Sequence, residues 1–237
     1  MLRTLLVWTT IVLSTTILGI LAFFTFPFDR GGDVVHLYAR LWGKSILWAS
    51  GVKVKVRGLE KITSRGPYIF MSNHLSAYDI FVLLAHLPLQ FRWLAKAELF
   101  RIPIFGWAMS TAGYISLDRS SPRRAYRSME EAARRIHEGV SVVIFPEGTR
   151  SRDGRLGPFM KGGFTLAVKA QVPVVPLAIK GTYEIMPPHT KKVLSRGEVV
   201  VVIGDPIETE GLSLRDRDKL MEEVRRGIEE ALEEAGA

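Results

Sequence analysis

The amino-acid sequence predicts an α/β protein: a mostly parallel sheet flanked by helices and preceded by an N-terminal membrane-associated segment of two helices. Three observations support this prediction. Short apolar runs typical of buried strands recur between residues 52 and 203. Helical patterns separate several of these runs, and strands that alternate with helices form parallel sheets with both faces covered. The first 28 residues are instead almost continuously apolar.

The overall composition fits one folded domain with an apolar extension. Of the 237 residues, 47% are hydrophobic and 24% are charged, which excludes an intrinsically disordered chain. Cysteine is absent, so disulfides, cysteine-ligated metal sites and a thiol nucleophile are excluded. The formal net charge of +8 predicts an anionic partner. Nucleic acid is not expected, because the N-terminus is apolar and no nucleic-acid recognition motif occurs.

Residues 5–28 contain no ionisable side chain and are predicted to form a membrane anchor. As a helix, this segment rises about 1.5 Å per residue and is long enough for the roughly 30 Å hydrocarbon core of a bilayer. A signal peptide is one alternative, but only Arg3 precedes the apolar stretch and no small-residue cleavage site follows it. A buried core helix is the other alternative.

Residues 34–49 are predicted to form a second, amphipathic helix. His36, Arg40 and Lys44 recur every four residues and share one stripe, while Trp and Tyr side chains cover part of the remaining surface. This pattern favours a helix that lies in the membrane interface with its cations toward headgroup phosphates. The alternative is an amphipathic helix packed on the folded domain. The turn over residues 26–32 allows either one membrane crossing or a hairpin within one leaflet.

Residues 1–50 are therefore assigned to the anchor and residues 51–237 to a single α/β domain. Strands are expected, in chain order, over residues 52–57, 68–71, 91–94, 114–117, 140–145, 172–179 and 199–203. Helices are expected from Ser121, where a serine cap precedes a proline, and over residues 164–170 and 214–233. Because ligand sites gather at the carboxyl ends of parallel strands, polar clusters directly after strands are the candidate site.

The first polar cluster reads Asn-His-Leu-Ser-Ala-Tyr-Asp and follows the strand expected over residues 68–71. On a continuous helix, His74 and Asp79 would point about 140° away from each other. If His74 lies in the loop and Ser76 begins the helix, Asp79 falls in the first turn and can reach back to the imidazole. Ser76 and Asp79 also match a capping box, and a capping role for Asp79 is compatible with a catalytic one.

The second polar cluster reads Phe-Pro-Glu-Gly-Thr-Arg-Ser and follows the strand expected over residues 140–145. A glycine-containing loop continues from it to residue 163. Its cations suit an anionic group, since arginine grips phosphate through paired hydrogen bonds and lysine adds a point charge. These cations are Arg150, Arg152, Arg155 and Lys161. A solvated charged loop is the alternative.

Four sequence blocks, in this order, resemble those of the glycerolipid acyltransferases, and most closely the bacterial 1-acyl-sn-glycerol-3-phosphate acyltransferases. The blocks are NHLSAYD at 73–79, KAELFRIPIFGW at 96–107 with LDR at 117–119, FPEGTRS at 145–151 and VPVVPLAI at 172–179. The resemblance implies transfer of a fatty acyl chain from acyl-CoA or acyl carrier protein to the sn-2 hydroxyl of lysophosphatidic acid. The product is phosphatidic acid, an intermediate of phospholipid biosynthesis.

The same resemblance implies that His74 is the general base and that Asp79 orients its ring. A histidine titrates at about pH 6.5, so the neutral base is available near pH 7. The chain has no G-x-S-x-G motif, so no acyl-enzyme intermediate is expected. Neither a metal nor a cofactor is expected beyond the thioester co-substrate, because one His–Asp pair supplies too few ligands for a zinc site.

The resemblance also implies substrate-binding residues. Arg150 is expected to bind the acceptor phosphate, and Glu147 to contact the glycerol moiety or to fix Arg150. The other expected substrate contacts are Asn73, Lys96, Arg119, Gly148, Thr149 and Lys161. Backbone near Gly157 or Gly162 would suit an oxyanion hole.

Other functions stay open at this point. The acceptor can be glycerol 3-phosphate, another lysophospholipid or an ornithine-type lipid, or the chain can be a non-catalytic membrane lipid-binding protein that keeps the fold. The catalytic domain is expected on the cytoplasmic face of the inner membrane, in contact with anionic lipids, because basic residues are concentrated after the apolar segment. Those residues are Arg40, Lys44, Lys53, Lys55 and Arg57.

Overall fold

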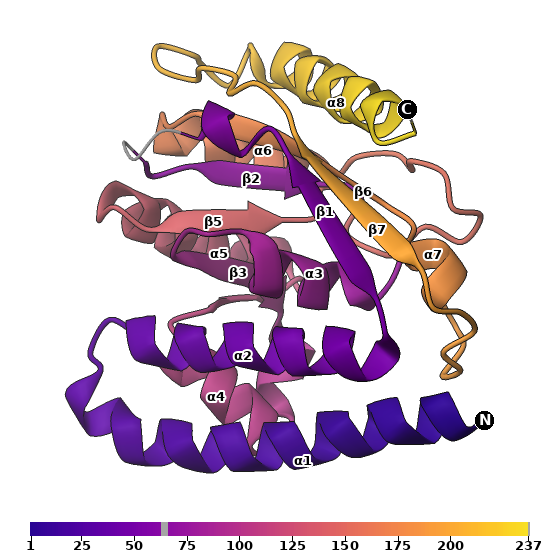
Figure 1. Ribbon diagram of the computed structural model, residues 1–237. Coiled ribbons are helices and arrows are strands. Elements are labelled where there is room, and N and C mark those ends of the chain that lie inside the picture. The colour runs from indigo at the N-terminus through magenta and orange to yellow at the C-terminus, as the bar shows by residue number, and fades with distance from the viewer. Residues whose placement is uncertain (63–65, 237) are drawn as a thin grey trace.

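The computed structural model describes residues 1–62 and 66–236. Within these residues, seven strands form one sheet in the order β1-β7-β6-β2-β5-β3-β4 (Figure 1). The strands are β1 (Lys53–Arg57), β2 (Ile69–Ser72), β3 (Phe91–Lys96), β4 (Ile115–Leu117), β5 (Ser141–Ile144), β6 (Val174–Lys180) and β7 (Glu198–Ile203). Each lies within or close to a strand expected from the sequence.

The sheet is mostly parallel, as predicted. Neighbouring strands pair in parallel throughout, except that β7 runs antiparallel to β6. β2 and β5 pair with Met71 opposite Ile144. Because the two strands end side by side, the polar clusters that follow them emerge at the same edge of the sheet.

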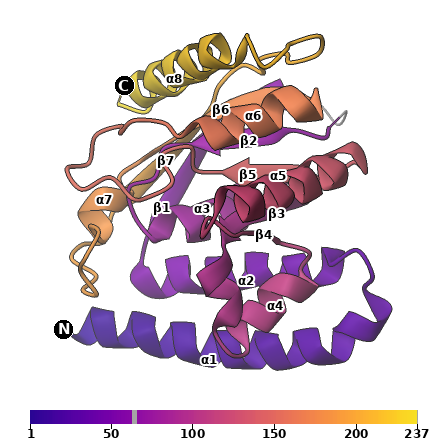
Figure 2. The ribbon, with the colours of Figure 1, turned by 180° about the vertical axis from the view of Figure 1, so that it is seen from behind.

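Both faces of the sheet are buried, and alternate residues of β2 show how. Phe70 packs in one core cluster, while Ile69 and Met71 pack in the other. Figures 1 and 2 show the helices on the two sides. One face is covered by α2 (Asp33–Ser50) and α3 (Tyr78–His86), the other by α5 (Pro122–His137), α6 (Lys161–Ala170) and α8 (Arg217–Glu234).

Four further helical segments lie between the described strands. They are the 3₁₀ helices η2 (Leu59–Lys61) and η3 (Ala97–Arg101), and the short helices α4 (Phe105–Thr111) and α7 (Thr182–Ile185). The sequence reasoning did not anticipate α4 or α7, because neither is long enough to show a helical period.

The first helix, α1 (Leu2–Thr25), lies along the outer side of α2, away from the sheet (Figure 1). A 3₁₀ turn over Phe26–Phe28 reverses the chain between them. Trp42 Nε1 donates to Thr15 Oγ1 at 3.0 Å, so α1 and α2 are joined by polar contacts as well as by packing. Leu2–Phe28 is apolar and long enough to cross a membrane, and 17% of its most apolar window is buried.

The prediction that His36 belongs to an exposed cationic stripe on α2 is wrong. This ring is fully buried, with Nδ1 3.1 Å from the Tyr114 hydroxyl and its edge against Phe91. Burial, together with the nearby Arg92 and Arg40 charges, lowers the pKa of His36 to about 3, so the ring is neutral. The helix therefore packs on the folded domain, which was the alternative interpretation.

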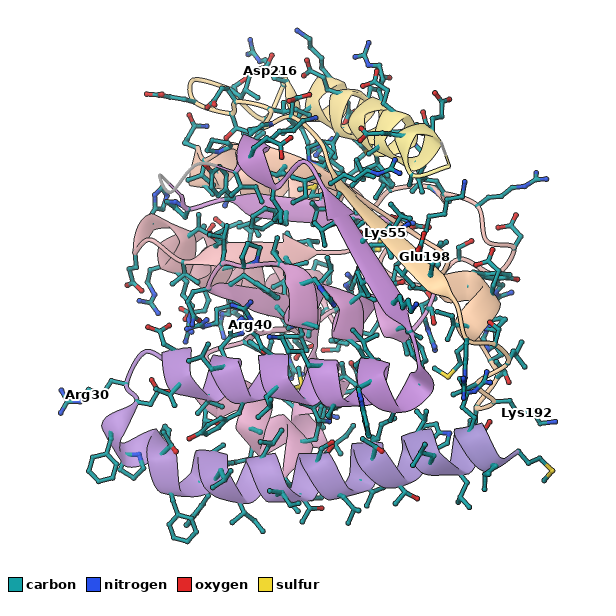
Figure 3. All side chains as sticks on the ribbon, viewed as in Figure 1. Arg30, Arg40, Lys55, Lys192, Glu198 and Asp216 are labelled. Carbon is teal, nitrogen blue, oxygen red and sulfur yellow. The ribbon has the colours of Figure 1, made fainter. Side chains whose placement is uncertain are left out.

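The outer face of α2 exposes large apolar side chains together with the cation Lys44. Its exposed large side chains include Leu37, Leu41 and Trp48, and Trp48 is 83% exposed. Figure 3 shows Arg40 on the side of the helix that faces the sheet (Figure 3). The four-residue spacing correctly places His36, Arg40 and Lys44 on one stripe of the helix. The N-terminal end of that stripe, however, faces the interior of the protein.

Candidate active site

The site lies at the carboxyl edge of β2 and β5. His74 follows β2, and residues 145–151 follow β5. The two loops are tied together by their backbones, because Ser151 N–H donates to the His74 carbonyl at 2.8 Å. The two polar clusters singled out in the sequence therefore form one site.

His74 and Asp79 are in contact, as predicted. His74 lies in the loop before α3 and Asp79 in its first turn, and Nδ1 is 2.8 Å from Asp79 Oδ2. The same oxygen accepts the backbone N–H groups of Leu75 at 2.7 Å and Ser76 at 2.8 Å. Asp79 is fully buried and thus both caps the loop and orients the imidazole. Because Asp79 binds Nδ1 of the His74 ring, the other ring nitrogen, Nε2, is left to face a substrate.

The His74 ring is also held through its face. It stacks on Phe145 with 3.8 Å between ring centroids and 9° between planes. Trp93 in turn stacks on Phe145 at 5.5 Å. The His74 side chain is 14% exposed, so it is accessible but confined to one orientation.

Glu147 joins two loops of the site. Its Oε1 accepts the His74 backbone N–H at 2.8 Å and its Oε2 accepts the Gly157 N–H at 2.9 Å. Burial raises the pKa of the Glu147 carboxyl above its ordinary value, and the two backbone donors oppose that rise. Both oxygens thus join loops of the site, and among the described residues no hydrogen bond or ion pair links Glu147 to Arg150. Gly157 N–H, already donated, is likewise not free for an oxyanion hole.

Asn73 is also structural, which corrects the expectation that it contacts substrate. The side chain is 1% exposed. Its Oδ1 accepts the Ile179 N–H at 2.8 Å and its Nδ2 donates to the Ile179 carbonyl at 2.9 Å. Asn73 therefore fastens the His74 loop to the neighbouring strand β6.

An apolar cavity of about 380 Å³ opens beside His74. The polar side chains around this end come from both motif loops, from the end of β3 and from the segment after β4. Six of the residues expected in the site line the cavity: His74, Lys96, Arg119, Gly148, Thr149 and Arg150. Three cations therefore share one cavity with the imidazole.

Gly148 is required by the backbone as well as by the space around it. Its φ of +70° lies in the left-handed region that other residues rarely adopt. A Cβ atom there would come within 2.4 Å of Met160 Sδ and 2.8 Å of Arg119 Nη1. The glycine therefore lets Arg119 approach the turn of the second motif.

The rest of the cavity is formed by the N-terminal helices, which the sequence reasoning did not find. Leu18, Gly19 and Ala22 of α1 line it, as do Val35 and Ala39 of α2. Residues 1–50, assigned to an anchor, thus also build part of the site. No signal in the sequence distinguishes these small and apolar residues from their neighbours in the same helices.

Lys161 is not brought to the cavity. Its Nζ lies 3.0 Å from Asp218 Oδ2 on α8, and its side chain is 57% exposed. Gly162, the other residue considered for an oxyanion hole, does not line the cavity either. Among residues 1–62 and 66–236, no group of three or more His, Asp or Glu side chains is placed to hold a metal ion.

Comparison with known proteins places this site in a family. The family model described as Acyltransferase matches residues 53–180, from β1 to the end of β6. The 1-acyl-sn-glycerol-3-phosphate acyltransferase of Pseudomonas aeruginosa is 32% identical over 98% of this chain and 91% of that protein. The chloroplastic 1-acyl-sn-glycerol-3-phosphate acyltransferase BAT2 of Brassica napus is 40% identical over 88% of this chain. This chain spans 59% of the length of that plant relative.

A solved structure extends the likeness to the whole fold. The crystal structure of the 1-acyl-sn-glycerophosphate (LPA) acyltransferase PlsC from Thermotoga maritima matches with a TM-score of 0.80 and 31% sequence identity. The match covers 97% of this chain and 94% of that chain, so it includes α1 and α2. With the family model matched across the sheet and relatives more than 30% identical, the chain belongs to the acyltransferase family.

Proposed function

We propose that the protein transfers a fatty acyl chain from an acyl thioester to the sn-2 hydroxyl of 1-acyl-sn-glycerol 3-phosphate, giving phosphatidic acid for phospholipid biosynthesis. The observation that carries this proposal is the place of His74, paired with a buried carboxylate where an apolar cavity meets three cations. This combination suits an acceptor with an acyl chain, a hydroxyl and a phosphate. The names of the relatives support the same reaction.

In this reaction His74 acts as the general base. Its Nε2 takes the proton of the acceptor hydroxyl while the hydroxyl oxygen bonds to the thioester carbonyl carbon. Asp79 stabilises the imidazolium that forms. The tetrahedral intermediate then collapses: the carbon–sulfur bond breaks, the ester remains, and the thiolate leaves with the proton held by His74. The donor is acyl-CoA or acyl carrier protein, and the proposal includes no resident cofactor.

The apolar part of the cavity is proposed to hold an acyl chain. It is lined by aliphatic and aromatic side chains of α1, α2, α3 and α4. Each methylene group removed from water contributes about 0.8 kcal/mol to the free energy of binding. Several methylene groups buried in the cavity would therefore contribute most of the affinity for a lipid. His74 at the polar end then meets the reacting groups.

The proposed reaction is tested by thioester release from purified protein. Acyl-CoA and acyl carrier protein serve as donors, with lysophosphatidic acid, glycerol 3-phosphate or another lysophospholipid as acceptor. We expect free thiol to appear in step with phosphatidic acid when lysophosphatidic acid is present. Release with another acceptor alone would change the substrate, and no release with any acceptor would favour a lipid-binding protein.

Replacing Arg150 with alanine is expected to raise the KM for lysophosphatidic acid about 10–100-fold, with a much smaller change in the KM for the thioester. Arg150 lines the cavity with His74, and a charge-assisted contact with phosphate contributes about 1.5–3 kcal/mol. Steady-state kinetics with each substrate varied in turn measure both constants. Arg152→Ala is the matched control, because Arg152 is exposed on the same loop and does not line the cavity. Equal rises in both KM values would give Arg150 a structural role.

We also propose that residues 1–50 attach the protein to the cytoplasmic face of the inner membrane, in contact with anionic lipids. The outer side of α1 exposes many large apolar side chains, beside the outer face of α2, where Leu37, Leu41 and Trp48 are exposed. Because α1 lies along α2, and Trp8 Nε1 donates to the Lys191 carbonyl at 2.8 Å, a hairpin within one leaflet is favoured over a single crossing. The excess of basic residues after the apolar segment supports the cytoplasmic side.

Replacing both Leu13 and Ile17 with glutamate is expected to lower the fraction of protein bound to vesicles at least tenfold. Each side chain is 57% exposed on α1 and neither lines the cavity. A charged residue at the centre of a membrane helix costs about 2.5–3.5 kcal/mol. Flotation on anionic vesicles measures the bound fraction, and Leu214→Glu, at a site 55% exposed before α8, is the matched control. Unchanged flotation of the double variant would remove α1 from the membrane contact.

A further inference from the structure

Asp79 has a fourth hydrogen-bond donor, which lies outside all four sequence blocks. Its Oδ2 is shared by the imidazole and two backbone N–H groups, as described above. Its other oxygen, Oδ1, accepts the hydroxyl of Thr182. Thr182 is fully buried and is the first residue of α7, directly after β6. The contact joins residues 103 positions apart in the chain.

The segment that carries Thr182 is anchored to the His74 loop at a second point. Ser76 Oγ donates to the Met186 carbonyl at 2.7 Å, just after α7 ends at Ile185. Gly181, which precedes Thr182, has a φ of +99°, and a Cβ there would lie 2.4 Å from the Glu198 carbonyl oxygen. The backbone that presents the Thr182 hydroxyl is therefore held on both sides.

Donors on both carboxylate oxygens fix how the carboxylate turns about its own bond. With Thr182 on Oδ1, the plane of the group is set, and Oδ2 stays directed at His74 Nδ1. A hydrogen bond to the ionised form also disperses its charge and weakens its pull on any one donor. Thr182 thus acts on both the direction and the strength of the bond between Asp79 and His74.

We propose that Thr182 is a positioning residue for the His74–Asp79 pair, its hydroxyl holding the carboxylate in the orientation that directs Oδ2 at His74 Nδ1. This inference rests on the proposed function, in which His74 accepts a proton. The hydroxyl of Thr182 donates to Asp79, and Thr182 does not line the cavity. It acts through Asp79.

Several charged groups besides Asp79 influence His74. Glu147, buried beneath the loop, accepts the His74 backbone N–H, and its charge favours the imidazolium. Lys96, Arg119 and Arg150 line the same cavity and oppose the imidazolium. The Thr182 hydroxyl donates to Asp79 and not to any of these four groups. A change in pH dependence in a variant without this hydroxyl therefore reports Thr182 alone.

The test compares three purified full-length variants with the unmodified protein in lipid vesicles. Thr182→Val removes the hydroxyl and keeps the shape, Thr182→Ser restores the hydroxyl, and Thr209→Val is the matched control. Thr209 is an equally buried threonine whose hydroxyl donates to the Val172 carbonyl at 2.8 Å, away from the site. The kcat and KM for lysophosphatidic acid are measured across the pH range, and the His74 ring is titrated by NMR.

For Thr182→Val we expect kcat to fall about tenfold with little change in KM, and the acid limb of the pH profile to move up by about half a unit or more. The sign follows from the charge: without the hydroxyl, Asp79 binds the Nδ1–H more strongly, the imidazolium is favoured, and a higher pH is needed to free the base. Thr182→Ser is expected to restore both values, and Thr209→Val to leave the profile in place.

The proposal is overturned if Thr182→Val and Thr209→Val give the same pH profile and the same His74 titration. It is also overturned if Thr182→Val and Thr182→Ala both fail to fold while Thr209→Val folds, since Thr182 is then needed for the structure alone. The NMR titration needs no turnover, so it judges Thr182 even if acyl transfer is absent. Failure of the proposed function shows separately, as thioester release that His74→Ala leaves unchanged.

Discussion

Replacing His74 with alanine is expected to lower acyl transfer about 10²–10⁴-fold, the usual loss when a general base is removed. The remaining rate comes from the cavity and the cations, which the substitution leaves in place. Among the described residues, the ring makes one side-chain hydrogen bond, to Asp79, and one stacking contact, with Phe145. Asp79 keeps its two backbone donors and Thr182 in the variant. The fold should therefore persist.

Thioester release measured alongside thermal unfolding checks this expectation. His137→Ala is the control, because His137 is an exposed histidine at the end of α5 and does not line the cavity. It should keep both the activity and the melting temperature of the unmodified protein. Turnover near the normal rate in folded His74→Ala protein would contradict the proposed mechanism.

The contact between His74 and Asp79 could be predicted from the sequence because it is local. A histidine before a helix and a carboxylate in its first turn can meet in few ways. The helix begins at Tyr78, two residues later than the capping box predicts, and Asp79 still lies in its first turn. The parallel sheet could also be predicted, since apolar strand patterns alternate with helices along most of the chain. Short-range geometry and periodicity thus predict the contact between His74 and Asp79 and the edge of the sheet where it lies.

Asn73 and Glu147 show what local reasoning could not give. Both are polar residues within motifs, and both were expected to contact substrate. In the structure they bind backbone groups: Asn73 those of Ile179, 106 positions away, and Glu147 the N–H of His74, 73 positions away. An amide or carboxylate that supports the site looks the same in sequence as one that binds substrate, because the difference lies in distant partners.

The α2 helix shows a second limit. A four-residue spacing establishes that side chains share a stripe, but not whether that stripe faces solvent, lipid or the protein. His36 is an ordinary cationic candidate in sequence, and only its contacts with Tyr114 and Phe91 make it a buried neutral ring. The same holds for Gly19, whose place in the cavity depends on the packing of α1 against the rest of the chain.

The second large effect is expected at Asp79, where asparagine separates charge from shape. The carboxylate receives three N–H donors on Oδ2 and the Thr182 hydroxyl on Oδ1. An asparagine can keep its oxygen toward the three N–H groups and turn its NH₂ toward Thr182, because a hydroxyl can accept as well as donate. The variant thus keeps the cap and the contact with His74, but it loses the negative charge.

We therefore expect Asp79→Asn to lower turnover at least tenfold while its melting temperature changes little. The imidazolium formed during proton transfer loses its counter-charge, which is the contribution that a triad carboxylate makes. The acid limb of the pH profile should move to lower pH, since a less stabilised imidazolium gives up its proton more readily. This shift is opposite in direction to that expected for Thr182→Val, so the two variants together report the charge on Asp79.

A purely capping role predicts a different result for the same protein. Loss of a cap costs about 1 kcal/mol of stability at most for such a conservative change, and it leaves the chemistry untouched. Asp79→Asn would then melt slightly earlier, transfer acyl chains at the normal rate and show an unmoved pH profile. Asp79→Asn keeps the shape of the side chain and the donors around it, so kinetics and thermal unfolding measured on one sample decide between the two roles. The Asp79 charge is needed for catalysis only if activity falls while the fold stays intact.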